Sequence, residues 1–281
     1  MVKAKLILLS AALLSLNACC NRPAMEWERL VMDAHRTGVT AATANNVEAA
    51  LGSVADGVYY APDGKEFKGS ATVLTADVLI SAQQVMAPLR EVVGFTCEEM
   101  SSHFPESTLS NWAVDLIASS VAELSGRRID VGILNFGGIR VDFPKGEILL
   151  DEVRSMFPFK NHLAYVELEG KDLLYLIEKM VSENNLQALS GVRMTVTDGV
   201  IDSLLVQGAE IDPKALYGIA TIDFLLDGGD NLKVARNARD LKIFKEIIID
   251  VVEPYVRKCY AEGIPVSYHT DGRVVIKNSA E

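Results

Sequence analysis

Histidine is scarce in this sequence, with only four among 281 residues, and the four are scattered along the chain. A two-metal catalytic site needs histidine, aspartate and asparagine side chains that cluster at strand ends. The four histidines are His35, His103, His162 and His269. The sequence therefore predicts that the chain has no complete dinuclear metal site and no cofactor of its own.

Basic residues are also in the minority, since 27 lysines and arginines face 38 aspartates and glutamates, for a net charge of −11. A protein that binds nucleic acid broadly needs a basic surface that displaces counterions from the phosphates. The composition argues against a nucleic-acid polymer as the partner. It does not exclude a small anionic ligand held by one or two local arginines.

Cysteine is equally sparse, with four residues and no C-x-x-C pair. This pattern fits neither a zinc site nor a disulfide framework. Cys97 and Cys259 either pair in an oxidising periplasm or remain two buried free cysteines. The sequence leaves both alternatives open.

The sequence has one apolar run near its start, at 6–16, and this run is too short to span a bilayer as a mature helix. Lys3 and Lys5 precede it and small residues follow it, which is typical of a signal peptide over 1–18. The letters LNAC at 16–19 are similar to the box at which bacterial lipoproteins are cleaved. We therefore expect lipid on Cys19 and an anchor in a bacterial membrane, at its periplasmic face or the cell surface. The alternative is an ordinary signal peptide with incidental cysteines.

Helical and strand patterns alternate along the rest of the chain without a strict repeat, which predicts a mixed α+β or α/β fold. A turn at 62–64 separates two predicted strands within 57–74, and Thr75 is the expected N-cap of the next helix. Helices are predicted at 25–38, 75–88, 107–125, 170–184 and 240–263. Strands are predicted at 91–97, 129–135, 162–170, 191–208 (a hairpin), 216–222 and 272–278.

The stretch LNFGGIRVDFPKGEILLDEVRSMFPFKN at 134–161 combines glycines, an arginine, amides and aromatic rings without a nucleophile or a histidine pair. Three segments, at 135–140, 158–161 and 221–230, each lie at or just after a predicted strand, where loops commonly build binding sites. Gly137 and Gly138 allow positive φ and close approach of a ligand to the backbone. This composition is typical of a site that holds a ligand.

The side chains of these segments match the parts of a nucleoside or nucleotide. Phe159 and Phe224 are flat faces on which a base can stack, at about 1–3 kcal/mol per base. Asp230, after the pair Gly228 and Gly229, can accept hydrogen bonds from two ribose hydroxyls. Further candidates are Arg140 for phosphate or ribose oxygens, and Asn135 and Asn161 for the edge of the base. Taken singly, each phenylalanine is more common as a core residue and the aspartate as a turn residue.

In this order, N-x-GG-I-R, PF-x-N and DF-L-x-x-GGD, the motifs over about 92–235 resemble the C-terminal, substrate-recognition domain of the 5'-nucleotidase family. The resemblance implies that Phe159 and Phe224 sandwich the base, that Asp230 holds the ribose and that Arg140 reaches ribose and phosphate. It places Asn135 and Asn161 as polar contacts to the base. We expect a nucleotide-binding domain at 92–281, after an N-terminal accessory segment at 19–91.

The sequence departs from the family pattern in several places. His103 stands where an arginine is expected, and it could still hydrogen-bond a ribose or phosphate or be a plain surface histidine. Ser110 replaces a glycine, and Asn231 and Leu232 alter the end of the last motif. The GNH and GH-x-H motifs of the family's separate metallophosphoesterase domain, which binds two metal ions, are missing from this sequence.

The sequence therefore leads to one main expectation about function. The chain would be a lipid-anchored nucleotide-recognition domain that works with a separate metallophosphoesterase subunit in extracytoplasmic nucleotide hydrolysis, and divalent metals would bind only that subunit. Two alternatives stay open: a non-catalytic nucleoside- or nucleotide-binding lipoprotein for uptake, and a decayed domain kept as an interaction scaffold. Whether the chain is an enzyme by itself is left undecided, because a fold does not establish a chemistry.

Overall fold

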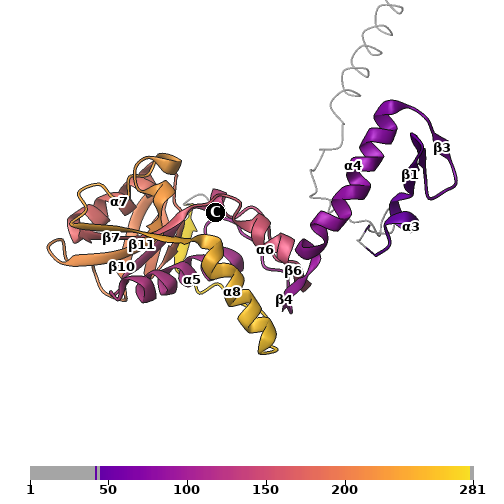
Figure 1. Cartoon of the computed structure of the whole chain (residues 1–281). Helices are drawn as coiled ribbons and strands as arrows, with labels where there is room; N and C mark the ends of the chain where they lie inside the picture. Colours follow the sequence, from indigo (N-terminus) through magenta and orange to yellow (C-terminus); the bar gives the residue numbers. More distant parts are fainter. Residues whose placement is uncertain (1–41, 43–44, 279–281) are drawn as a thin grey trace, which may run out of the picture. The chain divides into compact units, whose positions relative to one another are not determined.

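A computed structural model describes residues 42 and 45–278 (Figure 1). The predicted signal peptide, the lipidation candidate Cys19 and the helix predicted at 25–38 lie outside the described residues. The chain divides into two compact units, 1–83 and 84–281. Each unit is described below by itself.

The described part of the N-terminal unit is a small antiparallel sheet with two helices. The two strands predicted around the turn at 62–64 are present as β2 and β3. The elements are α3 (Val47–Leu51), β1 (Ser53–Ala55), β2 (Val58–Tyr60), β3 (Glu66–Phe67) and α4 (Ser70–Met86), with strand order β1-β2-β3.

The predicted start of helix α4 at Thr75 is wrong, because the helix begins five residues earlier at Ser70. The backbone N–H of Val73 already donates to the carbonyl of Gly69 at 3.0 Å, so the first turn closes directly after that glycine. Thr75 is therefore an interior residue of the helix. The predicted stop near Pro88 agrees with the end of α4 at Met86.

The C-terminal unit is built on a five-stranded mixed sheet of order β12-β7-β11-β5-β8. Strands β11 and β5 pair in parallel and the other neighbours pair antiparallel. The bounds are β5 (Val131–Leu134), β7 (His162–Glu169), β8 (Ala188–Ser190), β11 (Leu216–Ile222) and β12 (Asp240–Ile247). All four residues of β5 are buried, as a strand covered on both faces requires.

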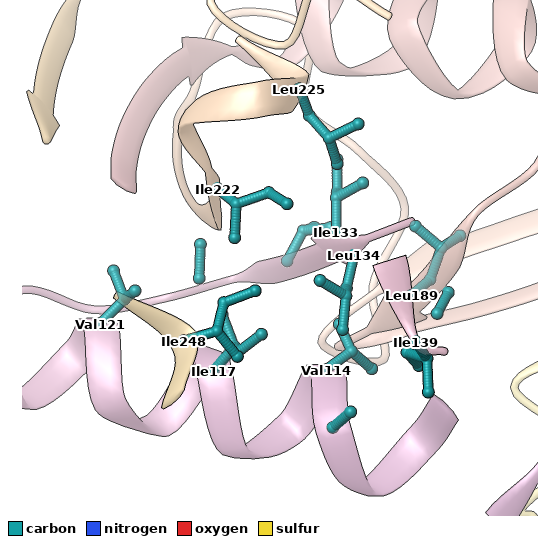
Figure 2. Packing of buried hydrophobic residues seen from close by; sticks show 14 of the residues in the cluster. Val114, Ile117, Val121, Ile133, Leu134, Ile139, Leu189, Ile222, Leu225 and Ile248 are labelled. Carbon is teal, nitrogen blue, oxygen red and sulfur yellow. The ribbon is translucent and has the colours of Figure 1, made fainter. Parts of the chain in front are cut away.

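Helix α5 (Thr108–Ser125) packs across this sheet, with contacts to β5, β7, β8 and β11. Figure 2 shows Val114, Ile117 and Val121 of the helix directed toward β5. Ser107 and Ser110 cap the helix reciprocally: each hydroxyl oxygen accepts a hydrogen bond from the other residue's backbone N–H. Ser110, which departs from the family's glycine, is thus a buried capping residue here.

Smaller elements surround the central sheet, and their order fits the mixed α/β class that the sequence predicts. Two further sheets are β4-β6 and β10-β9-β13. The remaining bounds are β4 (Val92–Thr96), β6 (Gly146–Leu149), α6 (Leu150–Met156), α7 (Gly170–Ser182), β9 (Val192–Thr197), β10 (Val200–Val206), α8 (Ile248–Ala261) and β13 (Val274–Lys277).

The prediction of a single long helix at 240–263 is wrong for its first third. Its first eight residues form the strand β12, which pairs with β7, and only 248–261 are helical. The open edge of β7 offers backbone partners to this segment, and strand pairing there overrides local helix preference. Helix α8 continues past Pro254 without ending there.

The two candidate cysteines are not bonded to each other. Cys97 is exposed and Cys259 is half-buried, and both are free. The disulfide alternative is therefore excluded in this structure. The second alternative holds for the free thiols but not for their burial, since neither cysteine is in the core.

Candidate functional site

The sheet topology brings the three predicted site segments to one end of the central sheet. The segment 135–140 follows β5, and the segment 223–230 follows β11, which runs parallel to β5. The segment 158–161 precedes β7, which runs antiparallel to β11, with Leu163 opposite Ile222. Loops that are distant in sequence therefore meet at this end of the sheet, where loops commonly build binding sites.

A direct side-chain contact joins the first and last segments. The Nδ2 of Asn135 donates to the Oδ2 of Asp230 at 2.8 Å, across 95 residues of sequence. Asn135 is only 5% exposed, whereas Asp230 is exposed to solvent. The buried amide thus fixes one carboxylate oxygen while the carboxylate as a whole stays accessible to a ligand.

The Oδ1 of Asn135 is buried and has no hydrogen-bond partner among the described residues. It lies against Gly138, where an added Cβ would stand only 2.6 Å from it. Neither Gly137 nor Gly138 uses the positive φ that a glycine allows. Gly138 serves close packing against the Asn135 amide, since no side chain fits in that space.

Both predicted base-stacking rings lie at the surface. Phe159 is 49% exposed and Phe224 is 43% exposed, so the alternative that either is a core residue is excluded. The loops that carry them are tied together, since the backbone N–H of His162 donates to Oδ1 of Asp223 at 3.1 Å. Both rings therefore belong to loops at the same end of the sheet and are partly exposed to solvent.

Arg140 lies beside one of these rings. Its Cζ is 5.9 Å from the centroid of the Phe159 ring, within the range of a cation–π contact. Its Nη1 donates to the carbonyl of Gly137 at 3.2 Å. The guanidinium is exposed and uses only part of its donor set in these contacts, so the remaining donors can reach an anionic ligand.

Three further predicted residues, Asn161, Gly229 and His103, make structural contacts of their own. Asn161 is half-buried, and its carbonyl accepts from the N–H of Ile248 at 3.1 Å. Gly229 packs so closely on Phe224 that an added Cβ would stand 2.0 Å from that residue's carbonyl oxygen. His103 is exposed, in the segment before α5, and its backbone N–H donates to Ser107.

A cleft of about 490 Å³ opens beside Asp230 and Gly137. The sequence did not indicate most of its lining. The rings of Phe104 and Phe136 lie 6.2 Å apart at 70°, and Asn185 and Gln187 also line the cleft. Phe136 stands inside the N-x-GG-I-R motif, which was the only available signal. The segment 184–187 carries no motif, and only the fold places it here.

No group of three or more histidine, cysteine, aspartate or glutamate side chains suited to a metal ion occurs among the residues that the structure describes. The charged side chains of the three site segments are Arg140, Lys160, Asp223, Asp227 and Asp230. The arrangement can therefore bind and orient a ligand through stacking, hydrogen bonds and two cations. The expectation that metals bind only a separate subunit stays a prediction.

A family model, "5'-nucleotidase, C-terminal domain", matches residues 87–237, which is more than half of the chain. The chain belongs to this family. The resemblance that the sequence motifs predicted is thus confirmed. The match contains all three site segments and the cleft.

Individual relatives of this 5'-nucleotidase C-terminal domain share less than a third of their aligned residues with it. An apyrase of Tabanus yao is 28% identical over 170 residues, which are 53% of this chain and 30% of the apyrase. The cell wall protein Lmo0130 of Listeria monocytogenes is 26% identical over 199 residues, 63% of this chain and 24% of that protein. The chain thus spans less than a third of the length of either relative.

The fold has counterparts among solved structures. A 5'-nucleotidase precursor from Thermus thermophilus superposes with a TM-score of 0.63 at 22% identity, over 78% of this chain and 48% of that one. At this identity the likeness concerns the fold alone. It confirms the mixed α/β class.

Proposed function

We propose that this chain recognises nucleosides or nucleotides and works with a separate metallophosphoesterase subunit in extracytoplasmic nucleotide hydrolysis. The observation that carries the proposal is the contact between Asn135 and Asp230, which joins the ends of β5 and β11 beside two exposed phenylalanines. An oriented, exposed carboxylate suits ribose hydroxyls, and exposed aromatic rings at the same end of the sheet suit a base.

Each part of the ligand has a proposed binding residue. The base stacks between Phe159 and Phe224, and Asn161 contacts its edge. Asn135, which was expected at that edge, is buried and acts instead by orienting Asp230. The ribose hydroxyls bind Asp230. Arg140 reaches the ribose and phosphate oxygens, and His103 is a further candidate for them.

The separate subunit is proposed because the sequence has dispersed histidines and no GNH or GH-x-H motif. Phosphoester hydrolysis at two metal ions needs such ligands to activate water and hold the phosphate. The recognition domain would present the nucleotide, and the subunit would supply the metals and the chemistry.

The extracytoplasmic location and the lipid anchor are part of this proposal. The LNAC motif at 16–19, which ends in Cys19, and the similarity to a cell wall protein support an extracytoplasmic location. No helix in the described part of the chain is both long and apolar enough to cross a membrane. Labelling cells with a radioactive fatty acid tests the anchor: Cys19→Ala should abolish the label, and Cys20→Ala is the matched control.

Two measurements test the function. Calorimetry of the purified chain with AMP and with adenosine should detect binding, which Phe159→Ala and Phe224→Ala weaken. Phosphate release from AMP with divalent metals should require the added subunit. If the chain binds nucleotide but no turnover occurs even with a metallophosphoesterase, the uptake alternative is favoured. If the chain binds no nucleotide, the interaction-scaffold alternative is favoured. Robust turnover by the chain alone would contradict the proposal of a separate catalytic subunit.

A further inference from the structure

A series of amide hydrogen bonds connects Phe136 to the backbone of Asp230 through two residues that line the cleft, Gln187 and Asn185. The backbone N–H of Phe136 donates to Oε1 of Gln187 at 3.2 Å. The Nε2 of Gln187 donates to Oδ1 of Asn185 at 2.9 Å and to its carbonyl at 3.1 Å. The Nδ2 of Asn185 in turn donates to the backbone carbonyl of Asp230 at 2.6 Å. These residues form what we term the amide relay, Gln187 and Asn185.

The relay holds Asp230 in an unfavourable backbone conformation. Asp230 has φ 47° and ψ 36°, and Asn231 after it has φ 58°, so two successive residues with side chains lie in the left-handed region. Such residues carry strain and persist only where surrounding contacts fix them. Asn185 fixes the backbone of Asp230, and Asn135 fixes its carboxylate.

The polarity of each amide in the relay is determined by its neighbours. Gln187 is 6% exposed, and its Oε1 must face the backbone donor of Phe136, so its Nε2 faces Asn185. Asn185 then receives at Oδ1 and donates from Nδ2 toward Asp230. The buried end of the relay is therefore coupled through the Asn185 amide to the backbone carbonyl of Asp230.

We propose that Asn185 and Gln187 are positioning residues that hold Asp230 in the geometry that accepts ribose hydroxyls, and so set the preference for a ribose over a sugar without them. This inference rests on the proposed function. Neither residue needs to touch the ligand, because each acts through the backbone of Asp230. Their loss should therefore weaken only the part of binding that depends on the hydroxyls.

The test is calorimetry on the full chain at fixed pH. The first ligand is whichever of adenosine, guanosine, cytidine and uridine binds best, and the second is its 2',3'-dideoxy counterpart. Asn185→Ala should weaken binding of the ribonucleoside about tenfold, because a displaced Asp230 carboxylate loses one hydrogen bond from a ribose hydroxyl. Binding of the dideoxynucleoside should stay unchanged. Gln187→Glu, which keeps the shape but removes the Nε2 donor, should act in the same direction with a smaller effect.

Asp230→Ala is the reference variant and should remove the preference for the ribonucleoside. Adding Asn185→Ala to it should then change nothing further, because the two residues act as one unit. Asp198→Gly is the control: Asp198 is exposed in the turn between β9 and β10, does not line the cleft, and lies at φ 50° that glycine adopts freely, so the preference should stay intact. Thermal unfolding checks that every variant is folded.

Two results would overturn the inference while the proposed function stands. One is an equal loss for both ligands in Asn185→Ala, which indicates a purely structural role. The other is an unchanged preference in Asn185→Ala and Gln187→Glu when Asp230→Ala abolishes it. If the wild-type chain binds no nucleoside, the proposed function fails, and this inference fails with it.

Discussion

Helices α4 and α5 are similar in length and both rich in apolar residues, but the fraction of their residues that is buried differs greatly. Of the 17 residues of α4, only Ala76 and Gln83 are buried. Of the 18 residues of α5, eight are buried, including Leu109, Trp112 and Ile117. Helix α5 packs on a five-stranded sheet, whereas the described part of the unit that holds most of α4 has three strands of two or three residues.

The comparison shows that apolar side chains in a helix do not by themselves make a core. Burial requires a facing surface of matching size, and a wide sheet supplies it. Exposed apolar residues of α4 include Leu74, Val78 and Leu79. We therefore expect substitutions to affect stability strongly in the C-terminal unit and weakly in the N-terminal one.

The largest difference should come from a matched pair of leucines. Leu109 of α5 is 0% exposed and Leu74 of α4 is 65% exposed. Leu109→Ala should lower the free energy of unfolding by about 2–5 kcal/mol, because it removes buried methyl groups and leaves a cavity. Leu74→Ala should change it by less than about 0.5 kcal/mol. Urea unfolding followed by circular dichroism measures both, and equal effects would contradict the comparison.

A buried ion-pair cluster should give the next largest effect. Arg273 is 7% exposed and its guanidinium donates to both oxygens of Asp115, at 2.9 Å each, and to Asp271 at 3.0 and 3.1 Å. Arg273→Leu should cost about 3 kcal/mol of unfolding free energy, since it leaves partly buried carboxylates without their cation.

The control for that substitution is an exposed ion pair in the N-terminal unit. Lys65 contacts Asp63 at 2.7 Å, and both side chains are largely exposed. Lys65→Met should cost less than about 1 kcal/mol, because surface ion pairs are screened by water and salt. The same urea unfolding experiment compares the two variants. A larger loss in Lys65→Met than in Arg273→Leu would overturn the expected ranking.

Ligand binding should distinguish the two units through exposed phenylalanines. Phe159→Ala and Phe224→Ala should each weaken nucleoside binding by about 1–3 kcal/mol, the contribution of one stacked base. Phe67 of the N-terminal unit is similarly exposed but stacks on Tyr59, and Phe67→Ala should leave the affinity unchanged. Calorimetry measures all three, and an unchanged affinity in the first two would exclude stacking at these rings.

The smallest expected effect is on the dependence of stability on pH. Burial and a hydrogen bond to Asp115 raise the pKa of Tyr268 to about 12, above the usual value near 10. A raised pKa means that folding favours the protonated phenol, so this stability is present below pH 10 and is lost as pH rises through 12. Tyr268→Phe should flatten that alkaline decline in thermal unfolding scans. An equally steep decline in the variant would show that Tyr268 does not contribute.

Much of the fold was predictable where the pattern was local. The stop of α5 at Gly126, which lies at φ 67°, follows from a glycine after a periodic helix. The hairpin of β9 and β10 follows from Asp198 and Gly199 between alternating residues. The start of α4 and the strand β12 were mispredicted, because strand pairing and the first helical turn depend on neighbours that periodicity does not reveal.

The candidate site divides in the same way. The motifs indicated the residues Asn135, Arg140, Phe159, Phe224 and Asp230, and the fold brings their segments together. Phe104 and the amide relay were not foreseen. Their contribution depends on contacts to residues about 30 or more positions away, such as those from Phe104 to Phe136 and from Asn185 to Asp230, and no local pattern marks such contacts.

The sequence alone determined the family, the mixed α/β class and the types of side chain that could hold a nucleotide, because these are written in short motifs and in periodicity. The tertiary structure alone decided which loops meet, which rings are exposed and what holds Asp230 in its left-handed conformation. The physical reason is that the pairing of β5, β7 and β11 sets the distances between residues far apart in the chain.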